Sequence, residues 1–536
     1  MTRAIKPACL ALAGLLISCN ADSGEVDDQP APDAPVVCGA DIVLADRQVR
    51  TTGGVVEGAP AGATVSFKGI PFAAPPVGEL RYRPPQPPAC REGVSPAVTF
   101  GAPCPQNLDG VLVGNEDCLT LNVWAPSVAT SAVRPVMVFI HGGGHQQGST
   151  SQLLDNGSVL LDGQRLAERS GAVVVTVEYR LGPLGFLAHP ALSAEGPEKS
   201  GNYGMLDQIE SLRWVRDNIA GFGGDATRVM VFGESAGGVS TCRLLASPLA
   251  KGLFSSATIE SGACVARTLA QAETQGTQVA QTVGCTDAAC LRTVSVAALM
   301  ATVPALESET ARQTYDGVID GYALLAAPLD VIKAGDHNHV PVIIGTNTEE
   351  QGRSVPLTMT QTEYETAVAA FAQSSGAPGL TQALLAQYPT SDYPSPRAAM
   401  VALLSDTKFN CSARKALRAL TAAQDEPVYQ YSFAKVPDSS TGAQRTLGAV
   451  HGIELIYVFD AFSSTAGIKD KAVITAVASA WGALASGGNP NAGGGLPVTW
   501  APYELTTESH LRFGDTITRG DHYRTEQCEF INTIAP

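Results

Sequence analysis

The chain has 536 residues, of which 45% are hydrophobic and 16% charged, as in a folded globular protein with a large core. Its formal net charge of −16 argues against a nucleic-acid-binding protein, because no basic cluster offsets it. Twelve cysteines without a C-x-x-C zinc pattern indicate an oxidising compartment in which disulfides form.

The N-terminus has the features of an export signal. Arg3 and Lys6 precede an apolar run over residues 8–17 that is too short to cross a bilayer. The run ends in LISC, which resembles a bacterial lipobox and implies cleavage before Cys19 and lipidation of its thiol. We therefore expect a signal peptide over residues 1–18 and an outer-membrane or cell-surface lipoprotein. The alternative is an ordinary secretory signal and a periplasmic or secreted protein.

Residues 19–37 are polar and rich in Asp and Pro, which predicts a disordered tether. From residue 38 to residue 536 the apolar pattern continues without a second low-complexity linker, so we expect one domain. Short runs split by glycine over residues 44–72 predict a small set of N-terminal antiparallel strands. Strand and helix patterns then alternate, which favours an α/β fold.

A buried strand, a sharp turn and a helix are predicted around the sequence GESAGG. The apolar run over residues 229–232 stops at Gly233, and Ala236 opens an amphipathic run that continues through Leu245. The turn strains the backbone at Ser235, so only small residues fit beside it. It also exposes the serine hydroxyl at the head of a helix, where backbone N–H groups can hold a developing oxyanion. Ser235 is therefore the candidate nucleophile.

The whole chain resembles the type B carboxylesterases, the carboxylesterase and cholinesterase branch of the α/β-hydrolases. The motifs that carry the resemblance occur in the family's order: EDCLTLNVW (116–124), HGGG (141–144), GNYGMLDQ (201–208), GFGGD (221–225) and GESAGG (233–238). The resemblance implies a large, mostly parallel central sheet flanked by helices. It also implies a serine carboxylesterase that hydrolyses small-molecule carboxylic esters through an acyl-enzyme. No phosphate-binding loop or dinucleotide fingerprint appears, so we expect no cofactor.

A serine needs a base to take its proton and an acid to orient that base. His451 lies in GAVHGIELIYVF, which is similar to the family's catalytic-histidine segment. In this fold the acid lies between the serine and the histidine in the chain, and here it would follow a strand predicted over residues 340–345. The resemblance implies Glu350 as the acid. Glu349 stays open as the alternative, because Gln351 stands where the family usually has glycine.

The same resemblance implies an oxyanion hole made of the backbone N–H groups of Gly143, Gly144 and Ala236. His145 departs from the family, which usually has an aromatic residue there, and we expect it to line the acyl pocket. A buried polar network behind the triad is also implied, although each member could instead be a simple structural hydrogen-bonding residue: Glu234, Ser261 and Glu454.

Ten cysteines remain once Cys9 is removed with the signal and Cys19 carries lipid. The resemblance pairs Cys104 with Cys118 and Cys285 with Cys290. The remaining pairing stays open, with these combinations as guesses: Cys38 with Cys90, Cys242 with Cys264, and Cys411 with Cys528. His337 and His339 could suggest a metal pair, but no third ligand lies nearby in the sequence, so we expect a solvated loop and no metal.

Three other functions can be weighed against a general carboxylesterase. A cholinesterase is disfavoured, because the segment between Cys104 and Cys118 (PQNLDGVLVGNED) has no aromatic residue to face a quaternary cation. A non-catalytic adhesion module of the same fold has no use for a strained elbow and a full triad. A lipase acting on lipid esters stays open, since a lid cannot be read from the sequence. The sequence does not indicate an oligomeric state.

Overall fold

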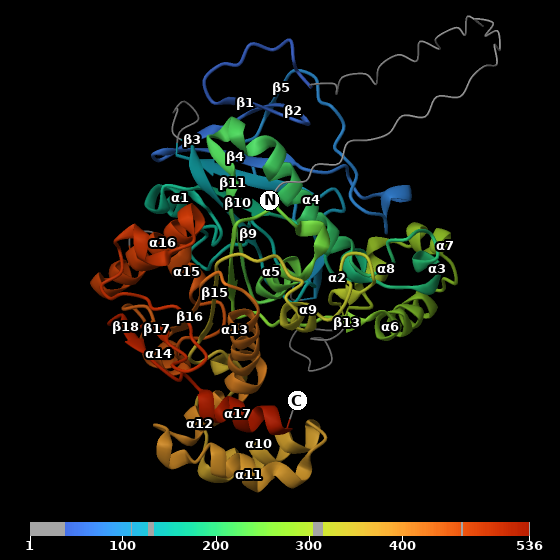
Figure 1. Cartoon of the computed structure of the whole chain (residues 1–536). Helices are drawn as coiled ribbons and strands as arrows, with labels where there is room; N and C mark the ends of the chain where they lie inside the picture. Colours follow the sequence, from blue (N-terminus) through green and yellow to red (C-terminus); the bar gives the residue numbers. More distant parts are fainter. Residues whose placement is uncertain (1–37, 109, 127–132, 304–314, 463–464, 535–536) are drawn as a thin grey trace, which may run out of the picture. The chain divides into compact units, whose positions relative to one another are not determined.

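The computed structural model describes residues 38–108, 110–126, 133–303, 315–462 and 465–534. The expected signal peptide, Cys19 and the tether lie outside these residues. Residues 38–536 form one compact unit, in which helices cover a central sheet (Figure 1). None of the helices in the described ranges is long and apolar enough to cross a membrane.

In the described residues, the central sheet has eleven strands in the order β18-β17-β16-β15-β12-β11-β9-β10-β8-β4-β3. Their bounds are β3 (Ala59–Ala61), β4 (Thr64–Pro71), β8 (Thr120–Ala125), β9 (Arg134–Ile140), β10 (Val173–Val177), β11 (Gly224–Glu234), β12 (Ser256–Glu260), β15 (Val342–Asn347), β16 (Val428–Phe433), β17 (His510–Phe513) and β18 (Thr518–Gly520). Neighbouring strands from β10 to β17 pair in parallel. β3, β4 and β8 at one edge and β18 at the other pair antiparallel with their neighbours. The predicted α/β fold with N-terminal antiparallel strands is confirmed.

Shorter strands lie outside the central sheet. They are β1 (Gln48–Thr51), β2 (Gly54–Glu57) and β5 (Val94–Pro96) in one small sheet, β6 (Gln106–Leu108) with β7 (Val111–Val113), and β13 (Arg267–Thr268) with β14 (Val318–Ile319).

The central strands are apolar along their whole length because both faces of the sheet are covered. In β9, Val136, Val138 and Ile140 belong to one hydrophobic cluster, and the intervening Met137 and Phe139 belong to another. Alternate side chains of a strand point to opposite faces, so these clusters are the two core layers on either side of the sheet.

Helices pack on both faces. Those of the described residues are α1 (Gln164–Ser170), α2 (Gly182–Phe186), α3 (Pro190–Ser193), α4 (Tyr203–Asn218), α5 (Ala236–Ala246), α6 (Leu269–Thr282), α7 (Ala288–Thr293), α8 (Val296–Met300), α9 (Pro328–Ala334), α10 (Gln361–Ser374), α11 (Thr381–Gln387), α12 (Pro396–Ser405), α13 (Cys411–Ala423), α14 (Gly442–Leu447), α15 (Leu455–Val458), α16 (Ile468–Gly487) and α17 (Thr525–Ile534). α4, α5, α9 and α13 contribute to the core layer that contains Val136, and α1, α15 and α16 to the layer that contains Phe139. α10, α11, α12 and α17 share a separate cluster, seen at the bottom of Figure 1.

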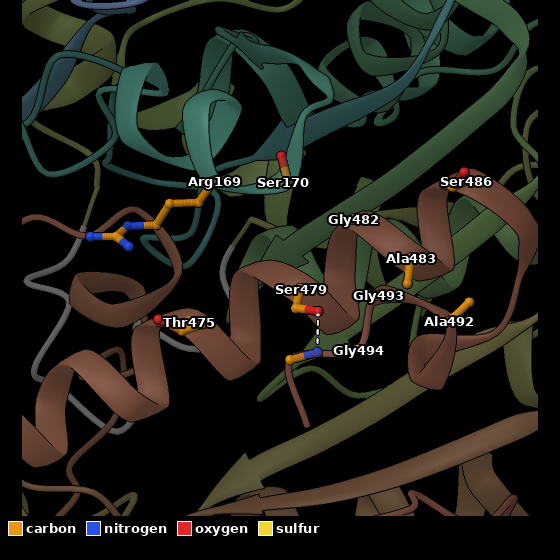
Figure 2. Close-up of a pocket in the computed structure, with 11 residues that line it drawn as sticks. Arg169, Ser170, Thr475, Ser479, Gly482, Ala483, Ser486, Ala492, Gly493 and Gly494 are labelled. Atoms are coloured by element: carbon orange, nitrogen blue, oxygen red, sulfur yellow. Dashed lines mark hydrogen bonds between the residues drawn. The ribbon is translucent and has the colours of Figure 1, made fainter. Parts of the chain in front are cut away.

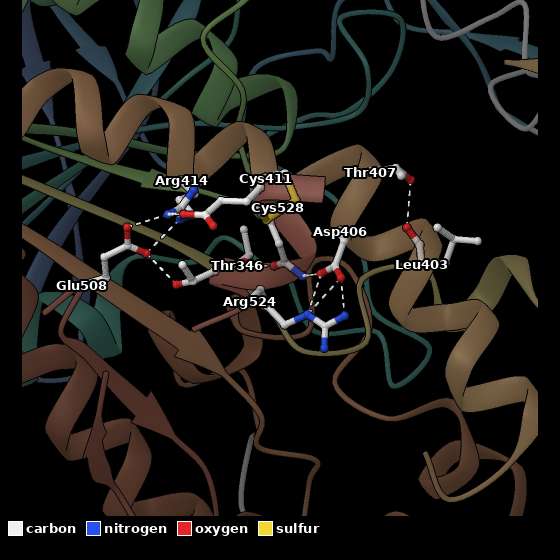
Figure 3. Close-up of a disulfide and its surroundings, with 12 residues drawn as sticks. Thr346, Leu403, Asp406, Thr407, Cys411, Arg414, Glu508, Arg524 and Cys528 are labelled. Atoms are coloured by element: carbon white, nitrogen blue, oxygen red, sulfur yellow. Dashed lines mark hydrogen bonds and ion pairs between the residues drawn. A yellow bond between two sulfur atoms is a disulfide. The ribbon is translucent and has the colours of Figure 1, made fainter. Parts of the chain in front are cut away.

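Five disulfides cross-link the described residues: Cys38–Cys90, Cys104–Cys118, Cys242–Cys264, Cys285–Cys290 and Cys411–Cys528. They include both pairs that the family resemblance implies and the three guessed pairs. The Cys411–Cys528 bond joins α13 to α17 and lies near the ion pairs of Arg414 with Glu508 and Arg524 with Asp406 (Figure 3).

Candidate active site

Ser235 lies in a sharp turn between the end of β11 and the start of α5. Its backbone has φ 56° and ψ −120°, a conformation that is uncommon for a residue with a side chain. The turn needs close backbone contact, since a Cβ on Gly237 would lie 1.9 Å from the carbonyl oxygen of Ile140. The Ser235 N–H donates to the carbonyl of Glu260 over 2.9 Å. The half-buried hydroxyl is therefore held at the head of α5, as predicted for a nucleophile elbow.

Glu350 is buried, and its carboxylate contacts the ring of His451. Its Oε2 atom lies 2.7 Å from His451 Nδ1. Its Oε1 atom accepts hydrogen bonds from the Ser261 hydroxyl over 2.6 Å and from the Asn347 N–H over 2.8 Å. This contact favours the tautomer of His451 that carries its proton on Nδ1 and an unprotonated Nε2, the form that can accept a proton.

Glu349, the alternative acid, has a different partner. Its Oε2 atom accepts from the Thr348 hydroxyl over 2.7 Å and from the N–H of Ala449 over 2.8 Å. It therefore braces the segment that leads to His451 and makes no hydrogen bond to the imidazole. The geometry brings Glu350 to the ring.

The three supporting residues lie in the same polar network. Ser261 donates to Glu350, and the Asn347 amide donates to Glu454. Glu234, next to Ser235 in the chain, places Oε1 at 3.2 Å from Nε2 of His451. The imidazole thus lies between two carboxylates, one at each ring nitrogen.

This arrangement raises the affinity of several groups for protons. Burial raises the pKa of Glu234 and Glu454, and it raises the pKa of Glu260 to about 8. At His451 burial acts in the opposite direction, but the nearby carboxylates, Glu234 and Glu350 foremost, outweigh it and raise the pKa to about 10. The imidazolium form, which arises when a base takes up a proton, is therefore strongly stabilised.

The glycine-rich loop after β9 approaches the serine from the other side. Gly143 and Gly144 have φ values of 102° and 63°, in the region that glycine tolerates best. A Cβ on Gly142 would lie 3.0 Å from Ser235 Cβ, so the loop and the elbow are in contact. The loop therefore presents its backbone beside the serine, where α5 presents the N–H of Ala236.

His145 ends this loop and does not behave as expected. It is only 3% exposed, and its ring nitrogens lie 3.1 Å from Asp316 Oδ1 and 3.0 Å from the Ser240 hydroxyl. The prediction that it lines the acyl pocket is wrong, because its ring is directed into a buried polar network.

The profile of the carboxylesterase family matches residues 45–531. The chain belongs to this family. It is 35% identical to fumonisin B1 esterase of Sphingopyxis macrogoltabida, with 88% of this chain and 87% of that protein aligned. It is also 35% identical to para-nitrobenzyl esterase of Bacillus subtilis, over 88% of this chain and 95% of that protein. A solved PNB esterase superimposes with a TM-score of 0.77 at 33% identity, covering 91% of this chain and all of that one.

As a member of the carboxylesterase family, the protein is a serine carboxylesterase that acts on carboxylic esters of small molecules. Its α/β-hydrolase fold places the elbow, the acid-bearing loop and the histidine-bearing loop at the carboxyl ends of β11, β15 and β16. This is the edge of an open parallel sheet where ligands bind in α/β proteins.

Sequence reasoning missed two residues of this carboxylesterase site. Asn347 donates to Glu350 through its backbone and to Glu454 through its side chain. The available signal was its position three residues before Glu350, just beyond the strand predicted over residues 340–345. Phe409 packs on the ring of His451, with 4.6 Å between the two ring centroids. It lies on η8 (Asp406–Asn410), a turn of π-helix that no sequence pattern announces.

Two other features lie apart from this site. His337 and His339 pack ring to ring at 4.4 Å, and His337 binds Gln424. Among the described residues, no group of three or more His, Cys, Asp or Glu side chains could hold a metal ion. A cavity of about 540 Å³ lies between α16 and residues 492–495, lined mainly by Gly, Ala and Ser (Figure 2). Ser235, Glu350 and His451 do not line it, and the Ser479 hydroxyl in its wall accepts a hydrogen bond from the N–H of Gly495.

Proposed function

We propose that Ser235, His451 and Glu350 form the catalytic triad of this carboxylesterase. The observation that carries the proposal is the 2.7 Å contact between His451 Nδ1 and Glu350 Oε2, beside a serine with strained backbone at the head of α5. Glu350 orients the imidazole, and His451 Nε2 takes the hydroxyl proton of Ser235 as Oγ attacks the ester carbonyl carbon.

The remaining steps follow from the same groups. The N–H groups of Gly143, Gly144 and Ala236 hold the carbonyl oxygen as it becomes negatively charged. His451 then gives its proton to the leaving alcohol, and an acyl group stays on Ser235. Water attacks this acyl-enzyme with His451 as base, which releases the carboxylic acid and restores the serine. Glu234, Ser261 and Glu454 stabilise the imidazolium and fix Glu350.

The test is hydrolysis of p-nitrophenyl esters from acetate to palmitate by wild type, Ser235→Ala and His451→Ala. Both variants should lose about 10³-fold or more of kcat, since neither can form the acyl-enzyme at neutral pH. Wild-type kcat that persists in folded Ser235→Ala would refute the assignment. The chain-length profile separates an esterase for short acyl chains from the lipase alternative.

We also propose that the enzyme is exported and anchored to a membrane through Cys19. The motif LISC at the end of the apolar run over residues 8–17 supports this, as does the cysteine content. The wild-type protein should partition into membranes, and Cys19→Ser should release or misprocess it. A wild-type protein without lipid whose mature N-terminus is another residue would contradict the proposal.

A further inference from the structure

His145 joins the two segments that supply the proposed oxyanion hole. It directly follows Gly144 in the loop after β9, and its ring Nε2 lies 3.0 Å from the hydroxyl of Ser240 on α5. Ser240 is one helical turn beyond Ala236, the donor that α5 supplies. The side chain of one residue therefore connects the glycine-rich loop to the helix.

The other ring nitrogen contacts a partly buried ion pair. His145 Nδ1 lies 3.1 Å from Asp316 Oδ1, and the same oxygen pairs with the guanidinium of Arg243 on α5. Arg243 is almost fully buried and also donates to the carbonyl of Val265. Asp316 is thus anchored to α5 as well, so both polar contacts of the His145 ring lead to that helix.

The hydrogen bonds have a consistent direction. With a proton on Nδ1, the imidazole donates to Asp316 and its Nε2 accepts from the Ser240 hydroxyl. The Ser240 oxygen in turn accepts from the side-chain amide of Gln208 over 3.1 Å. Burial, the foremost cause, lowers the pKa of His145, although Asp316 opposes it, so the neutral ring that this arrangement needs is favoured.

Backbone contacts reinforce the position of the loop. His145 has φ 55° and extends the left-handed conformation of Gly143 and Gly144. Its carbonyl accepts from the N–H of Gly182 over 2.6 Å, and its ring packs on Phe186 with 4.8 Å between centroids. A residue with this backbone strain persists only where its surroundings hold it in place.

We propose that His145 is a positioning residue that sets the spacing between the glycine-rich loop and α5 in the oxyanion hole. It touches no reacting atom. It acts by holding the N–H groups of Gly143 and Gly144 in register with that of Ala236. The proposal rests on the function proposed for those three residues. An aromatic residue that lined the pocket would not have this role, because it could not make the polar contacts of His145.

The test compares His145→Phe and Ser240→Ala with wild type and with Ser235→Ala. Phenylalanine keeps a ring against Phe186 but removes both polar contacts, whereas Ser240→Ala removes only the link through Ser240. For a p-nitrophenyl butyrate substrate, His145→Phe should lower kcat by about 10- to 100-fold with KM within about threefold of wild type. Ser240→Ala should lower kcat by a smaller factor, on the order of threefold to tenfold.

A second readout isolates the oxyanion hole. A trifluoromethyl ketone forms a hemiketal oxyanion on the nucleophile, so its Ki should rise in His145→Phe by about the factor lost in kcat/KM. The matched control is His337→Phe, which replaces another buried histidine whose ring hydrogen-bonds Gln424. It should leave kcat and Ki unchanged. Thermal unfolding of each variant checks that it is folded.

The outcomes separate the two proposals. If Ser235→Ala keeps activity, the proposed function fails. If Ser235→Ala is inactive while folded His145→Phe keeps wild-type kcat and Ki, only the role of His145 is overturned. If His145→Phe does not fold, the test rests on Ser240→Ala. Wild-type kcat and Ki in that variant would overturn the positioning role of His145.

Discussion

The imidazole of His451 contacts two buried carboxylates. Glu350 lies at Nδ1 and Glu234 lies at Nε2. The negative charge of Glu454 also raises the pKa of His451. In a buried site such carboxylates favour the imidazolium that forms when the serine gives up its proton. They also raise the pKa of the imidazole, so activity should fall on acidification, as His451 takes up a proton and can no longer accept one from Ser235.

Glu234→Gln tests this electrostatic contribution. Removal of the charge beside Nε2 lowers the pKa of His451, so the acidic limb of kcat/KM against pH should move to lower pH by about 1 unit or more. Glu349→Gln, which alters a carboxylate bound to a backbone N–H, is the control and should leave the limb in place. If the acidic limb of the kcat/KM profile stays in place or moves to higher pH in Glu234→Gln, this interpretation is contradicted.

Glu350→Gln tests the identity of the acid. The amide keeps the shape but can stabilise the wrong tautomer of His451, so kcat should fall by about 10²- to 10⁴-fold, less than in Ser235→Ala. Glu349→Gln should lower kcat by less than about tenfold. The reverse ranking in stopped-flow and steady-state assays would show that Glu349 is the acid.

The candidate triad could be predicted because each member lies in a continuous sequence motif, and Ser235 and Glu350 closely follow strands. The register between Glu349 and Glu350 could not, since a one-residue shift is settled only by which carboxylate reaches the ring. The partners of His145 could not be predicted from the sequence either. Asp316 and Ser240 are 171 and 95 residues away in the chain, and no local pattern relates them.

At the scale of elements, apolar strands were easier to locate than their polar ends. β11 was predicted over residues 229–232 but begins at Gly224, because its first residues are polar and its pairing with β9 shifts register before Val229. β15 starts two residues later than predicted, at Val342, after Pro341, which cannot donate to a ladder. It continues through Thr346 and Asn347 because they pair with β16.

The disulfides predict a graded loss of stability. Cys411 and Cys528 are 117 residues apart, whereas Cys285 and Cys290 are 5 apart. Loop-closure entropy then assigns about 5 kcal/mol to the long loop and about 2 kcal/mol to the short one. Denaturant unfolding of the two double-alanine variants should rank them in that order. A larger loss for the Cys285–Cys290 variant would contradict the entropic account.

At the scale of the whole molecule, the strand order of the sheet is what brings distant segments together. The elbow follows β11, the acid follows β15 and the histidine follows β16, and these strands pair through β12 in one parallel run. Alternating patterns in the sequence predict such a sheet but not the order of its strands, since pairing depends on crossovers whose partners are remote. The family resemblance supplied the expectation of a single assembled site.

The most direct test of the central claim is to locate the adduct that an organophosphate forms on the whole enzyme. Only an activated hydroxyl attacks such a reagent at an appreciable rate. After inactivation by diethyl p-nitrophenyl phosphate, peptide mapping by mass spectrometry should find one diethylphosphoryl group, on Ser235, in proportion to the activity lost. The Ser235→Ala variant should take up none. An adduct on another serine of the folded, inactivated enzyme would contradict the account.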